Sequence, residues 1–367
     1  MSSFIFPVIF LLFFSHLEVS LADSYSGDPI VFIHGVKGSR LRQKDGSCNW
    51  LTIWQAMGIL SPNLALPTEI NGGVQERDDL VAHDVLDAVG PKPIYGPFLS
   101  KAAQFGVPFH TFIYDWRRDN NETEEAFVQF LANLHGGRPV RVIAHSMGGL
   151  LTLAAMNARP ELFSQVVFVG VPFAGGIGFL PDLHSGRSTG LNSKILSSKV
   201  VGTFPSFLSL FPTESDRLVD VDGKIIPVNF YDPNDWQRLK IGPFSDAPPS
   251  PKYRSFFEGS MALAKKFREK LVTANIVYPP LLVIAGIGKL TLSRALLNGP
   301  KSELGWDFES AKMENGDGRV ALQHSQPPSG IPHSFMTVTG EHTEILSAQE
   351  SLAAMRKFLK LAPVMPQ

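Results

Sequence analysis

The stretch VRVIAHSMGGLLTLAAMNA, residues 140–158, decides the fold of this chain. Residues 140–144 are almost continuously apolar, as in a strand that is buried on both faces of a parallel sheet. A turn that contains glycines follows at once, and residues 149–158 have the composition of a helix. A buried strand that turns directly into a helix predicts an α/β protein.

The segments on either side repeat this alternation. Outside the central stretch we predict strands at 29–34, 107–114, 164–170, 280–286 and 334–339, and helices at 122–134 and 348–361. Residues 174–278 break the rhythm with many Pro, Gly and Ser residues, and only 256–271 reads as a convincing helix there. The pattern therefore predicts a mostly parallel sheet flanked by helices. We expect residues 23–174 and 280–367 to form this core, and residues 175–279 to form a cap inserted between its two parts.

The first residues predict a secretory signal. An apolar run spans residues 4–14, and Ser20-Leu21-Ala22 has the small residues that signal peptidase accepts. The run is shorter than the roughly 20 apolar residues of a membrane span, and an uncleaved anchor is the alternative. We expect residues 1–22 to be removed and the mature protein to be secreted or held in the endolysosomal lumen. The sequon Asn121-Glu122-Thr123 adds a predicted glycosylation of Asn121.

Composition and charge exclude several classes of function. The 33 basic side chains oppose 34 acidic ones and no basic run stands out, so a nucleic-acid partner has no electrostatic support. Cys48 is the only cysteine, so we expect a half-buried free thiol, no internal disulfide and no zinc site of the multi-cysteine kind. We expect no cofactor and no metal, and no obligatory protein partner is evident.

Ser146 is the predicted nucleophile. It lies where the strand turns sharply into the helix, the setting in which a serine is held in a strained turn with its hydroxyl projecting from the sheet. The positions two before and two after such a serine must be small, and Ala144 and Gly148 occupy them. An ordinary serine at a helix N-terminus is the alternative.

A serine hydroxyl needs a base, and the base needs a third group that orients it. In α/β-hydrolases the order along the chain is serine, acid, histidine. His342, just past the last predicted strand, is the preferred base over the other histidines after Ser146, which are His184, His324 and His333. Asp317, in a loop with flanking glycines, is the preferred acid, with Asp307 as its rival.

An oxyanion hole requires two backbone N–H groups aimed at the developing negative charge. One is expected from Met147, directly after the nucleophile. The other is expected from Val36, in the loop that follows the first core strand.

These pieces resemble the lecithin–cholesterol acyltransferase family, which also includes a lysosomal phospholipase A and plant acyltransferases. The motifs that carry the resemblance are PIVFIHGVKGSRL (29–41), YDWRR (114–118), AHSMGG (144–149), GVPFAGG (170–176), GDGRV (316–320) and EHTEIL (341–346). The resemblance implies an α/β-hydrolase fold with a lid, and it assigns nucleophile, acid and base to Ser146, Asp317 and His342. It assigns the oxyanion donors to Val36 and Met147.

Three departures from the family pattern stand out. Ala144 replaces the usual glycine, and Arg319 stands where a threonine is usual. Cys48 has no partner for the disulfide that pins the lid in vertebrate members, so a lid within residues 50–89 must be held by packing alone.

The resemblance implies a lipid serine esterase or O-acyltransferase that cleaves an acyl ester of a glycerophospholipid at a membrane or lipoprotein surface. An acyl-serine intermediate would pass its acyl group to water or to a lipid alcohol. A neutral-lipid (triacylglycerol) lipase and a catalytically inactive lipid-binding relative are the alternatives.

Overall fold

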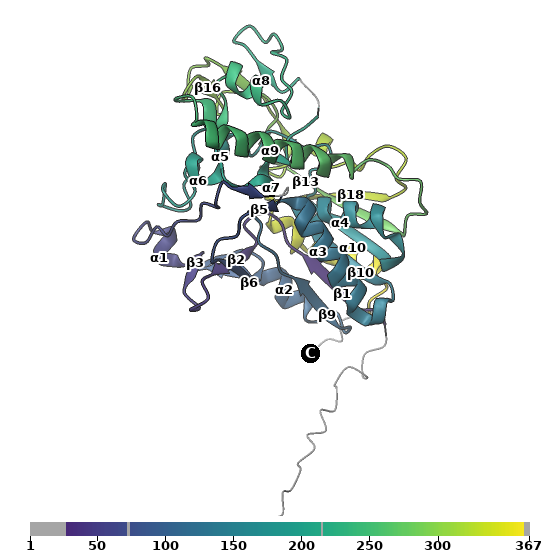
Figure 1. The fold of residues 1–367 in the computed structure, drawn as a ribbon. Helices are drawn as coiled ribbons and strands as arrows, with labels where there is room; N and C mark the ends of the chain where they lie inside the picture. The colour runs from purple at the N-terminus through teal and green to yellow at the C-terminus, as the bar shows by residue number, and fades with distance from the viewer. Residues whose placement is uncertain (1–26, 72–73, 214–215, 363–367) are drawn as a thin grey trace, which may run out of the picture.

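The computed structural model describes residues 27–71, 74–213 and 216–362. The predicted signal segment, residues 1–22, lies outside the described residues. In Figure 1 the sheet and its flanking helices form the lower part of the molecule, and the segment that connects strands β11 and β13 forms the upper part.

The central sheet has six strands in the order β18-β13-β11-β10-β1-β9, and every neighbouring pair is parallel. The strands are β1 (Ile30–Ile33), β9 (Phe109–Phe112), β10 (Val140–His145), β11 (Phe163–Val169), β13 (Leu281–Ile287) and β18 (Ser334–Thr339). All of the predicted core strands are present. The predicted α/β architecture is thus confirmed.

Helices cover both faces of this sheet, which explains why its inner strands are apolar without alternation. Val31 and Ile33 point to the face covered by α3 (Asn120–Asn133) and α4 (Met147–Ala158). Ile30 and Phe32 point to the other face, which α2 (Gly96–Ala102) and α10 (Gln349–Phe358) cover. Every residue of α4 from Met147 to Met156 is buried, so this helix is enclosed between the sheet and the segment above it.

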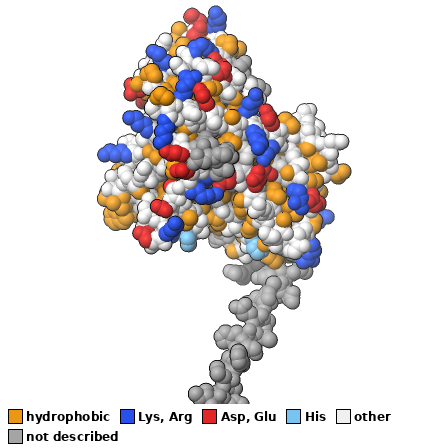
Figure 2. Space-filling model, in the orientation of Figure 1, with side chains coloured by type: hydrophobic (Ala, Val, Ile, Leu, Met, Phe, Trp, Pro, Cys, Tyr) orange, Lys and Arg blue, Asp and Glu red, His pale blue; other side chains and the backbone are white. Residues whose placement is uncertain are grey.

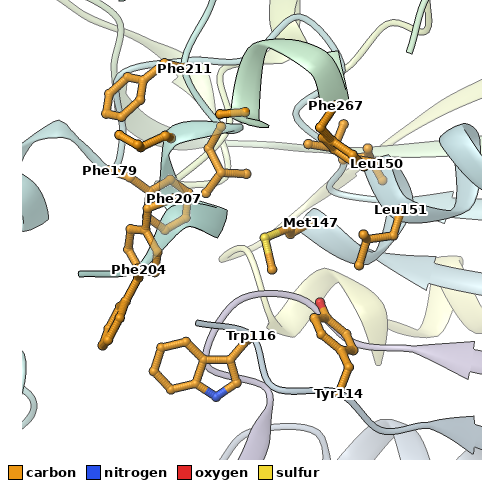
Figure 3. Packing of buried hydrophobic residues seen from close by; sticks show 14 of the residues in the cluster. Tyr114, Trp116, Met147, Leu150, Leu151, Phe179, Phe204, Phe207, Phe211 and Phe267 are labelled. Carbon is orange, nitrogen blue, oxygen red and sulfur yellow. The ribbon is translucent and has the colours of Figure 1, made fainter. Parts of the chain in front are cut away.

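Residues 171–279, between β11 and β13, contain more helix than the sequence predicted. They form α5 (Leu180–His184), α6 (Ser198–Val201), α7 (Pro205–Leu208), α8 (Pro233–Arg238) and α9 (Pro251–Glu269). Only α9 was expected, because the others are one or two turns long and carry no readable helical period. Aromatic side chains fill the space between these helices and α4, among them Phe204, Phe207, Phe211 and Phe267 (Figure 3).

The prediction of glycosylation at Asn121 is corrected by this fold. Asn121 lies within α3 and is only 5% exposed. Its side-chain amide donates to the Leu263 carbonyl oxygen at 2.9 Å and to Asp119 Oδ1 at 3.2 Å. A glycan requires a solvent-facing amide nitrogen, so Asn121 is a buried contact between α3 and α9 instead.

The described helices include none whose length and apolar character would allow it to cross a bilayer. Cys48 is half-buried and unpaired, as expected. An exposed apolar patch is formed by Ile53, Trp54, Met57, Ile59, Leu60 and Leu191. Figure 2 shows apolar side chains gathered at the left edge of the molecule, where Figure 1 places α1 (Ile53–Ala56).

Candidate active site

Ser146 occupies the turn between β10 and α4 with φ 55° and ψ −127°, a backbone conformation that residues other than glycine rarely adopt. Two glycines allow the chain to pack around it. A Cβ on Gly35 would lie 2.6 Å from Ser146 Cβ, and one on Gly148 would lie 2.5 Å from the His34 carbonyl oxygen. The predicted requirement for a small residue at position 148 therefore comes from contact with the end of β1.

The structure brings Ser146, Asp317 and His342 together. His342 follows β18, and its Nε2 lies 2.8 Å from Ser146 Oγ. Its Nδ1 lies 2.7 Å from Asp317 Oδ2, and its backbone N–H donates to the Asp317 carbonyl oxygen at 2.9 Å. An ionised carboxylate can only accept, so Nδ1 carries the hydrogen and the Nε2 lone pair faces the serine hydroxyl. A serine in this arrangement can give its proton to His342 as it attacks an electrophilic carbon.

Asp317 follows β17 (Met313–Gly316), which pairs antiparallel with β14 (Lys289–Leu292). Its Oδ1 accepts the backbone N–H groups of Arg319 at 2.9 Å and Val320 at 2.7 Å. Burial raises the pKa of Asp317, but the charge and hydrogen bond of His342 and these two N–H groups outweigh burial, so its pKa lies below the usual value. Asp317 is therefore held as a carboxylate.

The rival residues have other partners. Asp307 accepts the backbone N–H groups of Lys301, Glu309 and Ser310, which makes it the centre of a turn. His184 contacts the Glu303 carbonyl oxygen, and His333 contacts that of Ile331. His324 is only 4% exposed and packs beside Gly176.

The two expected oxyanion donors lie on segments that adjoin Ser146. Met147 is the first residue of α4, where an N–H has no partner within the helix. Val36 follows Gly35, whose close approach to Ser146 brings this loop over the nucleophile. The Gly35 N–H donates to Tyr95 Oη at 3.0 Å, which anchors the loop.

Sequence reasoning missed a second histidine at the site. His145 Nδ1 lies 2.8 Å from Tyr95 Oη, and His145 Nε2 lies 3.0 Å from the His342 carbonyl oxygen. Burial, followed by the nearby charge of His342, lowers the pKa of His145 to about 3, so it stays neutral. With Nε2 donating to the carbonyl, Nδ1 accepts from the tyrosine hydroxyl. The only sequence signal was its place next to the nucleophile.

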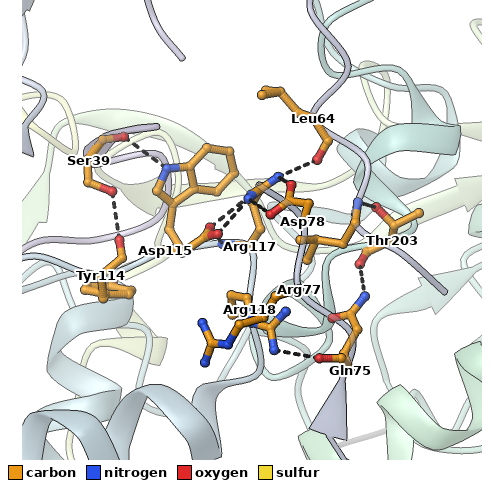
Figure 4. Close-up of polar contacts among 12 residues, drawn as sticks. Ser39, Leu64, Gln75, Arg77, Asp78, Tyr114, Asp115, Arg117, Arg118 and Thr203 are labelled. Carbon is orange, nitrogen blue, oxygen red and sulfur yellow. Dashed lines mark hydrogen bonds and ion pairs between the residues drawn. The ribbon is translucent and has the colours of Figure 1, made fainter. Parts of the chain in front are cut away.

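The YDWRR element does not contact the triad but fixes the chain around it (Figure 4). Arg117 is fully buried and uses its whole guanidinium group. It donates to both carboxylate oxygens of Asp115 and of Asp78 and to the Leu64 carbonyl oxygen, at 2.7–3.1 Å. This motif thus fastens Leu64 and Asp78 to the segment that follows β9.

Comparison with known proteins agrees with this picture. The model of the lecithin:cholesterol acyltransferase family matches residues 100–230. Lecithin-cholesterol acyltransferase-like 4 of Arabidopsis thaliana is 31% identical over 124 residues, which are 29% of this chain and 23% of that protein. Phospholipase A(1) LCAT3 of the same plant is 27% identical over 203 residues, 42% of this chain and 43% of that protein.

Among solved structures, a chain of the Tle4–Tli4 complex superposes with a TM-score of 0.55 at 15% sequence identity, covering 92% of this chain and 100% of that chain. The fold is thus the predicted α/β-hydrolase fold, and the resemblance to the lecithin:cholesterol acyltransferase family is confirmed over the matched residues. The chain spans less than half the length of the curated relatives it matches.

Proposed function

Because this chain matches the lecithin:cholesterol acyltransferase family over residues 100–230, we propose that it is a lipid serine esterase or O-acyltransferase. Its substrate is an acyl ester of a glycerophospholipid. The observation that carries the proposal is the continuous hydrogen-bonded chain from Ser146 Oγ through the His342 ring to Asp317, with steps of 2.8 and 2.7 Å.

The reaction runs in two halves. His342 Nε2 takes the proton of Ser146 as Oγ attacks the ester carbonyl, and Asp317 stabilises the charged imidazole. The N–H groups of Val36 and Met147 stabilise the tetrahedral oxyanion. His342 then protonates the departing lipid alcohol, which leaves acyl-Ser146. Water or a second lipid alcohol, deprotonated by His342, attacks the acyl carbon and releases the serine.

The exposed apolar patch supports action at a lipid surface. Trp54 is 55% exposed, Ile59 is 59% exposed and Leu191 is 81% exposed. The backbone N–H of Leu191 donates to the Ala56 carbonyl oxygen at 2.8 Å, so the two segments of the patch lie together. Contiguous exposed apolar side chains of this kind are typical of surfaces that bind lipid or protein. Secretion, or residence in the endolysosomal lumen, rests on residues 1–22 and belongs to the same proposal.

The triad is tested first with a fluorophosphonate probe, since only an activated serine reacts with it quickly. Ser146→Ala should abolish labelling and lower turnover roughly a million-fold. The matched control is Ser255→Ala on the exposed face of α9, which should label like the wild type. Full labelling of Ser146→Ala would contradict the proposal. The absence of labelling in the folded wild-type protein would contradict it as well.

The reaction outcome is then read from products. The purified protein is incubated with liposomes that contain labelled phosphatidylcholine and a lipid alcohol. Free fatty acid alone indicates a phospholipase, and a new ester of the alcohol indicates an acyltransferase. If phosphatidylcholine gives neither product, the protein is incubated with triacylglycerol instead. Hydrolysis of triacylglycerol alone would favour the neutral-lipid lipase.

A further inference from the structure

Three cationic side chains converge on one carboxylate beside the triad. Asp182, in α5, is fully buried, and its Oδ1 lies 2.9 Å from Lys37 Nζ. Its Oδ2 lies 3.4 Å from Arg319 Nη1 and 3.8 Å from Arg187 Nη1. We call Lys37, Arg187 and Arg319 the cation cluster. Three positive charges against one negative charge leave a surplus of two.

This surplus is not balanced within the described part of the chain, where no second carboxylate forms an ion pair with the cation cluster. The cations also repel one another. Burial lowers the pKa of Lys37, and the charges of Arg319 and Arg187 add to that effect. The pKa of Arg187 is lowered first by the charge of Arg319. An anion entering the cluster would relieve this repulsion and gain charge-assisted hydrogen bonds.

The cation cluster borders the proposed reaction site. Lys37 directly follows Val36, the expected oxyanion donor, and Arg319 donates its backbone N–H to Asp317 Oδ1 at 2.9 Å. The side chains are accessible in part: Lys37 is 21% exposed, Arg319 is 23% exposed and Arg187 is 53% exposed. The cation cluster is therefore partly open to solvent beside the segments that carry Val36 and Asp317.

Two buried aromatic rings lie directly against the same cations. Lys37 Nζ lies 5.8 Å from the centre of the Phe207 ring, and the Arg319 guanidinium lies 5.3 Å from that of Phe179. These two rings are 5.5 Å apart and belong to the apolar cluster that also contains Met147 (Figure 3). These contacts hold Lys37 and Arg319 in place beside Asp182.

We propose that the cation cluster binds the phosphate of a phospholipid head group, and that the enzyme prefers phospholipids whose head group has a net negative charge. This inference rests on the proposed function. The planar Arg groups suit phosphate oxygens. In a glycerophospholipid only the glycerol carbons separate the phosphate from the scissile ester, so a phosphate site is expected beside the triad. A choline ammonium would be repelled by the remaining positive charge, and a neutral glyceride would leave the cluster unfilled.

The test keeps the membrane surface constant. All vesicles contain the same fraction of a non-hydrolysable anionic ether lipid, and a minor labelled ester is either phosphatidylglycerol or phosphatidylcholine. The wild type should hydrolyse the phosphatidylglycerol roughly ten-fold faster in kcat/KM. Arg187→Gln should bring this ratio close to one, whereas Arg159→Gln, an exposed arginine paired with Glu161, should keep it. Equal rates in the wild type, or a ratio that survives Arg187→Gln, would overturn the proposal.

Two further measurements separate the possible failures. Hydrolysis of p-nitrophenyl butyrate by the wild type reports on the triad alone, so its absence refutes the proposed function and not the anion site. Binding is then measured independently of activity, as the change in Tm on addition of glycerol phosphate. The Tm of the wild type should rise, and that of Arg187→Gln should not. An unchanged Tm of the wild type would overturn the anion site. An equal rise in the Tm of the wild type and of Arg187→Gln would overturn it as well. A rise with inorganic phosphate, without any head-group preference on vesicles, would assign the cluster to free phosphate and overturn the head-group proposal.

Discussion

Asp307 and Asp317 are both buried carboxylates, 0% and 2% exposed, and only their partners distinguish them. Asp317 accepts from the His342 ring, whereas Asp307 accepts from three backbone N–H groups of its own turn. A carboxylate that orients the base also selects its tautomer. The acid is thus identified by its hydrogen-bond partner and not by its burial.

We therefore expect Asp317→Asn to lower kcat by about ten-thousand-fold, because an amide can donate to Nδ1 and so favour the wrong tautomer. Asp307→Asn should lower the free energy of unfolding and leave kcat within a few-fold of the wild type. Steady-state kinetics and urea unfolding of both variants check this. The reverse ranking in kcat would reassign the acid to Asp307.

Tyr95 joins the expected oxyanion loop to the nucleophile strand, since its hydroxyl accepts from the Gly35 N–H and contacts His145 Nδ1. Tyr95→Phe should lower kcat roughly ten-fold with KM little changed, because the Val36 N–H loses its anchor. It should also cost about 1–3 kcal/mol of unfolding free energy, because a buried donor is left unpaired. Tyr253→Phe, which removes a hydroxyl bonded to the Gly202 carbonyl oxygen, is the matched control. Equal kcat losses in the two variants would show that Tyr95 acts through stability alone.

At the scale of elements, buried polar contacts hold residues 53–71 and Asp78 on the core together with the buried side chains of Leu64 and Leu66. Asn192 donates to the carbonyl oxygens of Gln55 and Leu60 at 2.8 and 3.0 Å. Arg117 donates hydrogen bonds to Asp78 and to the Leu64 carbonyl oxygen. Cys48 is a free thiol, so these contacts act there without a disulfide.

Arg117→Lys should therefore not be conservative. Lysine keeps the charge but cannot bind Asp115, Asp78 and the Leu64 carbonyl oxygen at once, so we expect a loss of about 2 kcal/mol or more of unfolding free energy. The midpoint of urea unfolding measures this loss. Arg159→Lys, at an exposed ion pair with Glu161, should change it by less than about 0.5 kcal/mol. Wild-type stability of Arg117→Lys would contradict the role given to the YDWRR element.

At the scale of the whole molecule, buried histidines make stability depend on pH. Burial lowers the pKa of His34 to about 4 and that of His145 to about 3, and it also lowers the pKa of His184, against 6.5 in the unfolded chain. Below pH 6.5 the unfolded chain binds protons that the folded chain does not, so stability falls as pH falls. The lowered pKa values of Asp317 and Asp182 act in the same direction at still lower pH.

Between pH 6.5 and about 4 the free energy of unfolding should drop by about 1.4 kcal/mol per pH unit for each histidine. Urea unfolding at pH 7, 6 and 5 measures this slope. His145→Gln should remove the contribution of that one group, about 1.4 kcal/mol per pH unit, because it can no longer titrate. Constant stability across this range would mean that the buried histidines can accept a proton within the fold.

Much of the architecture was determined by the sequence alone. Continuous apolar runs predicted the strands of a sheet covered on both faces, and the strand-turn-helix at residues 140–158 predicted the position of Ser146. Chain order and neighbouring glycines selected Asp317 and His342, which the structure brings together. These signals are local, because period, turn and motif are properties of consecutive residues.

Only the tertiary structure decided the features that depend on distant segments. Asn121 lies in a sequon that reads as exposed, and packing of α9 against α3 buried it. Tyr95 and His145 are 50 positions apart, and Lys37 and Asp182 are 145 apart, so no pattern along the chain pairs them. The physical reason is that burial, charge compensation and hydrogen-bond partners depend on distances in space, which are fixed only when the insertion packs over the sheet.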